Sequence, residues 1–397
     1  MSTLAFPPGF LWGAATSAHQ TEGANSNTDW WDFEHQPGST CVESSGDACD
    51  SWHRWREDLD AVAALGLGLY RFSVEWARIE PAPGEFSTAA LDHYRRMAAG
   101  CVDRGIIPMV TLHHFTNPRW VAAQGGWEWD GIADRFAAYV ARAAGALGDI
   151  VPWFCTINEP NAFAVVGWID GKFPPGRNDD FAGCVAAMEN QRAAHAKAVA
   201  AVKGVAPDAK VGITLSIDEL EAVDGGEDMV TAAHRFMEDA YLEELRGDDF
   251  VGVQTYTRTR IGPAGPVEPV QGADVVQMGY EFWPEALEAT LRRTWSVTGG
   301  LPMFVTESGI GTDDDGRRIE YVRRALAGVH RCLADGLDVL GYCYWSLLDN
   351  FEWNDGYAKT FGLISVDRST FARTPKPSAG WYGDVARSNA VDAAPTT

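Results

Sequence analysis

Short apolar runs alternate along the chain with longer segments in which apolar residues recur at helical spacing. The apolar runs span residues 10–16, 69–76, 106–113, 152–158, 210–216, 249–256, 302–307 and 339–346. Most of these runs are apolar on both faces, as in strands that are covered on both sides of a parallel sheet. The pattern therefore predicts eight buried parallel strands.

The segments between these runs are rich in alanine and charged residues and predict helices. They span residues 54–65, 88–104, 131–147, 181–205, 228–245, 284–297, 317–335 and 377–387. Eight alternations of strand and helix predict an α/β fold, a single (β/α)8 TIM barrel with elaborated loops on its C-terminal face. We expect residues 1–389 to form this domain and residues 390–397 to form a polar tail.

The longest irregular stretches each follow a predicted strand, and they span residues 21–51, 117–130, 167–180 and 257–279. In a barrel of parallel strands, all four stretches fall on the face where such enzymes keep their active sites. Side chains at the ends of the strands are therefore the first candidates for function.

Composition narrows the classes of partner. The chain has 397 residues with 32 basic and 55 acidic side chains, a formal charge of −23. Such a surface repels phosphate backbones and anionic lipid, so we expect neither nucleic acid nor membrane as a partner. Seven cysteines without a Cys-x-x-Cys pair indicate reduced thiols, and the absence of Lys and Arg before Arg54 means that the N-terminal segment lacks the basic flank of a secretory signal, so we expect a cytoplasmic protein.

Two carboxylates stand at the ends of predicted strands. Glu159 ends the fourth strand in "TINEP", and Glu307 ends the seventh in "VTESG". In a barrel these two residues face each other across the mouth. An opposed pair of carboxylates is the minimum equipment for cleaving a glycosidic bond, which needs a proton donor and an anion or nucleophile.

Other strand ends supply suitable neighbours. Arg71 and Tyr256 can keep one carboxylate ionised through charge and hydrogen bonding, while the other retains its proton; a structural ion pair is the alternative for Arg71. Aromatic faces for a sugar ring are offered by Trp345, Trp353 and Phe361. Hydrogen bonds to its hydroxyls are offered by Gln20, His114, Asn158 and Glu352.

At these residues the sequence closely resembles the family 1 glycoside hydrolases, the β-glucosidase family. The resemblance runs from "FPPGFLWGAATSAHQTEG" to "RTPKPSAGWY". It implies a retaining barrel enzyme in which Glu159 is the general acid/base and Glu307 the nucleophile. It also implies that Asn158 contacts the 2-hydroxyl, and that Trp345 forms the aromatic floor. The remaining matches, in "SAHQTEG", "TLHHFTNP" and "DNFEW", imply a grip on the glycone by Gln20, His114, Glu352 and Trp353.

Several positions depart from the commoner family pattern. The departures are Phe115, Gln254, Thr255 and Ser308, and the chain is short for the family. Asn161 and Tyr280 stand where tryptophans often line the leaving-group side, so we place these two residues on that side. A carboxylate at Glu352 repels phosphate, which favours a sugar without a phosphate group.

The expected function is hydrolysis of the terminal β-linked sugar of a small neutral glycoside or oligosaccharide, without metal or cofactor. A transglycosidase that uses the same covalent intermediate is an alternative. So is a preference for galactose or fucose, since Glu352 can bind their hydroxyls too. A non-catalytic sugar-binding barrel fits less well because both carboxylates are kept. A metal-dependent hydrolase fits less well too, because such an enzyme would need metal-ligand spacing such as His-x-His after the first strand, and this chain lacks it.

Overall fold

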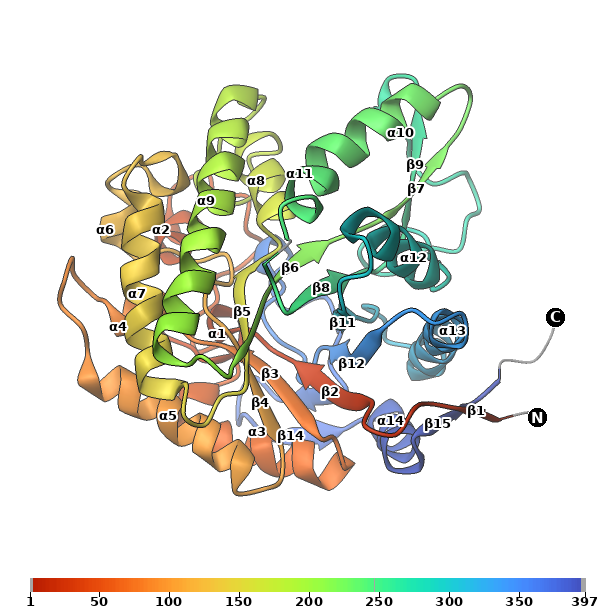
Figure 1. Cartoon of the computed structure of the whole chain (residues 1–397), viewed down its shortest axis with the longest axis horizontal. Coiled ribbons are helices and arrows are strands. Elements are labelled where there is room, and N and C mark those ends of the chain that lie inside the picture. Colours follow the sequence, from red (N-terminus) through yellow and green to blue (C-terminus); the bar gives the residue numbers. More distant parts are fainter. Residues whose placement is uncertain (1–2, 246, 394–397) are drawn as a thin grey trace.

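Eight parallel strands close into a barrel at the centre of the computed structural model, which describes residues 3–245 and 247–393 (Figure 1). The barrel strands are β2 (Leu11–Ala15), β3 (Leu69–Ser73), β4 (Ile107–Thr111), β5 (Trp153–Asn158), β6 (Lys210–Ser216), β8 (Phe250–Gln254), β11 (Met303–Ser308) and β12 (Val339–Trp345). β12 pairs with β2 and closes the ring. The predicted barrel is thus confirmed, and each predicted strand end lies within three residues of the observed one.

The large helices surround the barrel strands (Figure 1). They are α3 (Ser51–Leu65), α5 (Thr88–Val102), α7 (Ile132–Leu147), α9 (Phe181–Val205), α10 (Glu227–His234), α12 (Ala286–Thr298), α13 (Asp315–Ala334) and α14 (Pro377–Ser388). The single helix predicted over residues 228–245 is instead interrupted. There α10 runs into a π-helical turn, η2 (Arg235–Asp239), and then into the short α11 (Ala240–Leu242).

The loops between the barrel strands and the large helices contain short elements of their own. The helical ones are α1 (Ala18–Thr21), α2 (Asp29–His35), α4 (Trp76–Ile79), α6 (Arg119–Ala122), η1 (Gly126–Glu128), α8 (Pro160–Trp168) and η3 (Trp353–Asp355). A small sheet above the barrel consists of β7 (Glu219–Ala222), β9 (Arg258–Gly262) and β10 (Gly265–Pro266). β13 (Ile364–Val366) and β14 (Arg373–Pro375) form a hairpin before α14.

The first residues of the predicted tail are ordered. Strand β15 (Ala390–Asp392) pairs antiparallel with β1 (Thr3–Ala5), and the side chain of Val391 is buried. The two ends of the described chain therefore lie side by side (Figure 1). The last four residues of that tail, 394–397, lie outside the described residues.

Side chains that point inward from successive strands fill the barrel. One cluster of fully buried residues includes Leu69, Met109, Cys155, Phe250 and Phe304. Because side chains alternate along a strand, Arg71 lies on the same face of β3 as Leu69, nearer the mouth. Any site at the mouth therefore rests on a packed apolar floor.

Two barrel strands are irregular just where they reach the mouth. Val305 and Glu307 are two residues apart on β11, but their partners on β8 are adjacent. Cys155 and Asn158 are three residues apart on β5, but their partners on β6 are only two residues apart. An extra residue in one strand turns the following side chains to the opposite face. Glu307 and Asn158 thus face the barrel interior, where plain alternation from the inward-facing Phe304 and Cys155 would turn them outward.

The described part of the chain contains no helix that is both long and apolar enough to cross a bilayer. All seven cysteines are unpaired, and all except Cys41 are buried. The cytoplasmic location stays a prediction.

Candidate active site

A cavity of about 200 Å³ opens at the carboxyl ends of the barrel strands, and we call it the central cavity. Of the residues selected from the sequence, those that line it are His114, Asn158, Glu159, Tyr256, Tyr280, Glu307, Trp345, Glu352, Trp353 and Phe361. Its wall is completed by Phe115, Ala162, Val166, Phe173 and Met278. Side chains that are far apart in the sequence thus meet in one place.

Glu307 is held by two donors, one on each carboxylate oxygen. Arg71 donates from Nη1 to Oε1 at 2.5 Å, and the Tyr256 hydroxyl donates to Oε2 at 2.6 Å. Burial, the largest effect, raises the pKa of Glu307 above its usual value, and the charge of Arg71 and the hydrogen bond from Tyr256 offset part of this rise. The two partners therefore fix both oxygens and stabilise the ionised carboxylate against the effect of burial.

Arg71 also connects Glu307 to the neighbouring amide of Asn158. Its Nη2 donates to Oδ1 of Asn158 at 2.6 Å, and Gln254 donates to the same oxygen at 2.9 Å. With this oxygen occupied by donors, the Asn158 amide nitrogen lies 3.2 Å from Nε2 of His114. The orientation of the Asn158 side chain is thereby determined before any ligand enters.

Glu159 occupies a different environment from Glu307. It is the N-cap residue of α8, with φ of 41° in the left-handed region, and Pro160 takes the first position of the helix. Its amide donates to the carbonyl of Thr214 at 2.8 Å, while no hydrogen bond to its carboxyl is found among the described residues. Burial, and then the charge of Glu307, raise the pKa of Glu159 well above its usual range. Glu159 is therefore the carboxyl group that keeps its proton.

Glu352 lines the same cavity and is contacted by Gln20. The Gln20 amide donates to Oε2 of Glu352 at 3.4 Å and to the carbonyl of Phe351 at 2.9 Å. Ser17 donates to the other end of the Gln20 amide at 2.7 Å. Burial, and then the charge of Glu307, raise the pKa of Glu352 to about 8. Gln20 itself is fully buried and acts on the cavity through Glu352.

Aromatic rings form a stacked layer beside these polar groups. The His114 ring is nearly parallel to those of Trp345 and Trp353, with centroids 5.8 and 6.2 Å apart and angles of 17° and 16°. His19 stacks on Trp353 at 5.7 Å and 3°. Burial, and then the charge of Arg71, lower the pKa of His114 well below its usual range, so its ring is neutral. The layer offers flat apolar faces at the mouth.

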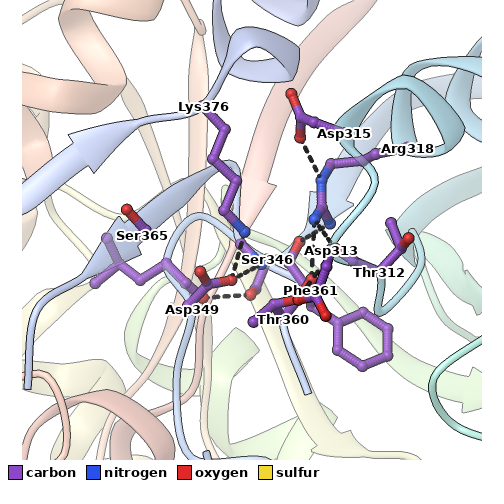
Figure 2. A network of polar contacts seen from close by, with 12 residues as sticks. Thr312, Asp313, Asp315, Arg318, Ser346, Asp349, Thr360, Phe361, Ser365 and Lys376 are labelled. Carbon is purple, nitrogen blue, oxygen red and sulfur yellow. Dashed lines mark hydrogen bonds and ion pairs between the residues drawn. The ribbon is translucent and has the colours of Figure 1, made fainter. Parts of the chain in front are cut away.

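Phe361, which also lines the cavity, is fixed at its backbone by the buried side chain of Arg318 (Figure 2). This guanidinium donates to the carbonyl oxygens of Ile310, Thr312, Thr360 and Phe361, at 2.6 to 3.0 Å. It also forms an ion pair with Asp315 at 2.9 Å. One cation thereby joins the loop that follows β11 to the loop that carries Phe361.

A second ion pair supports the same loop from the other side (Figure 2). Asp349 pairs with Lys376 at 2.8 Å and accepts the backbone N–H of Gly362 at 2.7 Å. Phe361 and Gly362 are adjacent, so the carbonyl bound by Arg318 and the N–H bound by Asp349 belong to the same peptide group, which the two charged networks of Figure 2 hold at both ends. The position of the Phe361 ring is thus set by groups that do not line the cavity.

The structure does not bring Asn161 into the central cavity. Its side chain is fully buried, donates to the carbonyl of Ser216 at 2.6 Å and accepts the amide of the same residue. The amide is thus used to tie α8 to the end of β6, which the sequence does not reveal. Tyr280, the other residue placed on the leaving-group side, does line the cavity.

The apolar residues Phe173 and Met278 were not selected from the sequence. Both belong to stretches expected to be irregular, 167–180 and 257–279, and nothing in the sequence distinguishes them from other loop residues. His113 faces away from the cavity and contacts Trp127 and Asn117. In the described part of the chain, no three side chains of metal-binding type gather at one point.

Comparison with known proteins gives one consistent match. Residues 2–248 and 249–391 match the sequence model of the family described as "Glycosyl hydrolase family 1". Beta-glucosidase A of Thermotoga maritima is 32% identical, covering 99% of this chain and 100% of that protein. A bifunctional beta-D-glucosidase/beta-D-fucosidase of Bifidobacterium breve is 33% identical, covering 96% of this chain and 98% of that protein. The crystal structure of the beta-glycosidase BGL167 superposes with a TM-score of 0.91 at 46% identity, covering 99% of each chain.

Proposed function

Because the chain belongs to glycosyl hydrolase family 1, we propose that it is a retaining β-glucosidase with Glu307 as nucleophile and Glu159 as general acid/base. It removes the terminal non-reducing β-linked sugar from a small neutral glycoside or oligosaccharide. The names of the relatives support this activity, since Beta-glucosidase A of Thermotoga maritima matches over its whole length.

The difference between the two carboxyl groups is the observation that carries the proposal. Glu307 has a cation and a phenol on its two oxygens, whereas Glu159 has neither and lies in the field of Glu307. Two chemically identical side chains whose pKa values are pushed apart are suited to the opposite roles of base and acid. Hydrolysis of a glycoside needs both roles at one bond.

The reaction has two steps. A carboxylate oxygen of Glu307 attacks the anomeric carbon while Glu159 gives its proton to the departing oxygen, which leaves a glycosyl ester on Glu307. Ester formation removes the negative charge of Glu307, so the pKa of Glu159 falls and its carboxylate can accept a proton from water. That water then attacks the anomeric carbon, and the sugar leaves with its original β configuration.

The remaining cavity residues bind the sugar in this proposal. Hydrogen bonds to hydroxyls come from His114, Asn158, Glu352 and Trp353, Gln20 positions Glu352, and Arg71 and Tyr256 orient the nucleophile. Trp345 forms the floor and Phe361 a side wall, with their apolar rings against the C–H face of the sugar. Tyr280 lies on the leaving-group side.

Fucose is a second candidate for the terminal sugar that the enzyme removes. The relative from Bifidobacterium breve is named for both β-glucosidase and β-fucosidase activity. Glucose and fucose differ at the 4- and 6-positions, so the residues that bind the hydroxyls there determine which sugar is accepted. A fucosidase activity alongside the glucosidase is therefore the second candidate function.

The test is an NMR time course with 4-nitrophenyl β-glucoside, β-fucoside and β-galactoside. We expect β-glucose to appear first and the α-anomer only by mutarotation, with no product from Glu307→Gly. Early α-glucose would contradict the retaining mechanism. Turnover of the fucoside or galactoside alone would move the proposal to that glycone, and predominant transfer to added acceptors would favour a transglycosidase.

A further inference from the structure

Trp353 lines the central cavity in a backbone conformation that bulky residues rarely adopt. Its φ is 51°, in the left-handed region, and the residue is 6% exposed. This conformation is unfavourable for a residue with a large side chain and persists only where the surrounding structure holds it. The contacts of the Trp353 ring therefore decide how that ring is presented to a sugar.

Two of the described rings lie nearly parallel to the ring of Trp353. His114 does so at 6.2 Å and 16°, and it lines the central cavity itself. His19 does so at 5.7 Å and 3°, is 1% exposed, and is not among the residues that line the cavity. Among the described rings that do line it, His19 contacts Trp353 alone. Any effect of His19 on a bound sugar therefore passes through Trp353.

Buried polar groups hold the imidazole of His19 at both of its nitrogens. The Asn25 amide nitrogen donates to Oε2 of Glu75 at 2.8 Å and lies 3.2 Å from Nδ1 of His19. An amide nitrogen only donates, so Nδ1 accepts and the ring hydrogen is on Nε2. That nitrogen lies 3.6 Å from Oε2 of Glu34, whose other oxygen accepts the hydroxyl of Ser45 at 2.7 Å. Each ring nitrogen thus faces a group of complementary polarity, which orients the ring.

His19 and Gln20 are neighbours on α1, and they contact two neighbours at the start of η3. Gln20 donates to Glu352, while His19 stacks on Trp353. Two further hydrogen bonds join Gln20 to the backbone of Phe351, at 2.9 Å to its carbonyl and 3.2 Å from its N–H. One short helix thus carries consecutive side chains that hold consecutive residues of the cavity.

We propose that His19 is a positioning residue for sugar binding, which holds the Trp353 ring in the orientation that binds the terminal sugar. Asn25 and Glu34 act one step further from the sugar, by orienting the imidazole. The inference rests on the proposed function, in which Trp353 binds the sugar. It assigns a role in substrate affinity to Glu34, whose buried carboxyl group does not line the central cavity.

The test separates binding from chemistry in variants that lack the imidazole ring. His19→Leu and His19→Asn should each raise KM for 4-nitrophenyl β-glucoside, and the inhibition constant of glucose, about fivefold, the size expected for the loss of an aromatic contact. The value of kcat should stay within about threefold, because the groups that cleave the bond are not touched. His19→Phe keeps a flat ring and should bring both constants back to within about twofold of the wild type.

A double variant shows whether His19 acts through Trp353. In a Trp353→Leu background, His19→Leu should change neither constant further, because the ring that it positions is already gone. His93→Leu is the matched control, since His93 is buried on α5 and stacks on Trp52 at 3.7 Å and 16°, and neither residue lines the central cavity. It should keep the wild-type constants. Urea unfolding of each variant establishes that the protein assayed is folded.

The possible failures are distinct. Normal turnover with unchanged constants in the folded His19 variants would overturn this inference and leave the proposed function intact. Simple addition of the effects of His19→Leu and Trp353→Leu would also overturn it, since His19 would then act by another route. An equal rise in His93→Leu would do the same, by tracing the effect to a general loss of packing. If the wild type turns over no glycoside at all, the proposed function and this inference fail together.

Discussion

The Arg71 guanidinium and the Glu307 carboxylate form a buried ion pair with a nitrogen–oxygen distance of 2.5 Å. Removing either partner from such a pair leaves an uncompensated charge in the interior. The pair also has a second function, because Arg71 donates to Asn158 and so aligns an amide with the same carboxylate. Chemistry and architecture at the barrel mouth thus depend on one guanidinium.

Glu307→Gly should reduce the hydrolysis of 4-nitrophenyl β-glucoside by about 10^5-fold or more, because no covalent intermediate can form. Added azide fits the vacated space and should restore turnover as the α-glycosyl azide, identified by NMR. Glu159→Gly serves as the comparison, since azide there attacks the glycosyl ester and gives the β-azide. A β-azide from Glu307→Gly would contradict its role as nucleophile.

Glu159→Gln should remove the alkaline limb of the pH profile of kcat/KM. The raised pKa of Glu159 means that the acid is protonated at neutral pH and loses its proton as the pH rises, so wild-type activity declines on the alkaline side. The loss of rate should be about 10²–10⁴-fold for an alkyl leaving group and much smaller for 2,4-dinitrophenolate, which departs without a proton. An alkaline limb that persists in the variant would assign it to another group.

Tyr256→Phe should lower kcat/KM by about 10- to 100-fold and move the acidic limb of the pH profile to higher pH. The Tyr256 hydrogen bond lowers the pKa of Glu307, so its loss lets burial raise that pKa further. The nucleophile then needs a higher pH to ionise. Tyr280→Phe removes a hydroxyl from the same cavity without touching Glu307, and its acidic limb should stay in place.

The stability of the fold should decline as the pH rises from 4.5 to 7 because of Glu22, which is 3% exposed. Burial raises its pKa from 4.5 to about 7, with Arg78 opposing the shift. The folded state therefore binds a proton that the unfolded state has lost. The contribution is complete below pH 4.5 and absent above about pH 7, a difference of about 3 kcal/mol at most.

Urea unfolding at pH 5 and pH 8 measures this effect of Glu22. The free energy of unfolding should differ less between the two pH values in Glu22→Gln than in the wild type. Glu57→Gln, which changes an exposed residue of α3, should keep the wild-type difference. Equal pH dependence in all three proteins would show that Glu22 stays ionised through its pairing with Arg78.

Arg318→Met should destabilise the protein by about 3–5 kcal/mol, since Asp315 and four carbonyl oxygens lose a buried donor. It should also raise KM, because Phe361 loses its anchor. Arg323→Met is the matched control on α13, where a partly exposed ion pair with Glu320 is worth about 1 kcal/mol or less. Similar unfolding midpoints for the two variants would contradict the anchoring role.

The sequence reveals the barrel because its strands are apolar on both faces, a pattern that follows directly from burial. It also reveals Glu159 and Glu307, since both stand where an apolar run ends. The bulges that turn Asn158 and Glu307 inward cannot be predicted from the sequence. An extra residue in one strand relative to its neighbour does not change the composition of either strand. Alternation alone would place these two side chains on the outer face.

The surroundings of the central cavity were less predictable. Stretch 257–279 was expected to be irregular, yet it contains β9 and β10, and β9 pairs with β7, which lies over thirty residues earlier in the chain. A sheet with non-local pairing and no apolar alternation gives little local signal. The position of Asn161 could not be predicted for the same reason, because its side-chain amide binds the backbone of Ser216, which is distant in the sequence.

The pairing of β1 with β15 places Thr3 directly opposite Asp392. Opposed residues of antiparallel strands lie roughly 5 Å apart at their α-carbons, so a linker of a few residues suffices to join them. The backbone then becomes a closed circle that can be reopened at an exposed turn such as Asp224–Gly225. Such a circular permutant would begin and end beside the barrel mouth, where a fused carbohydrate-binding module or a surface tether lies close to the incoming substrate.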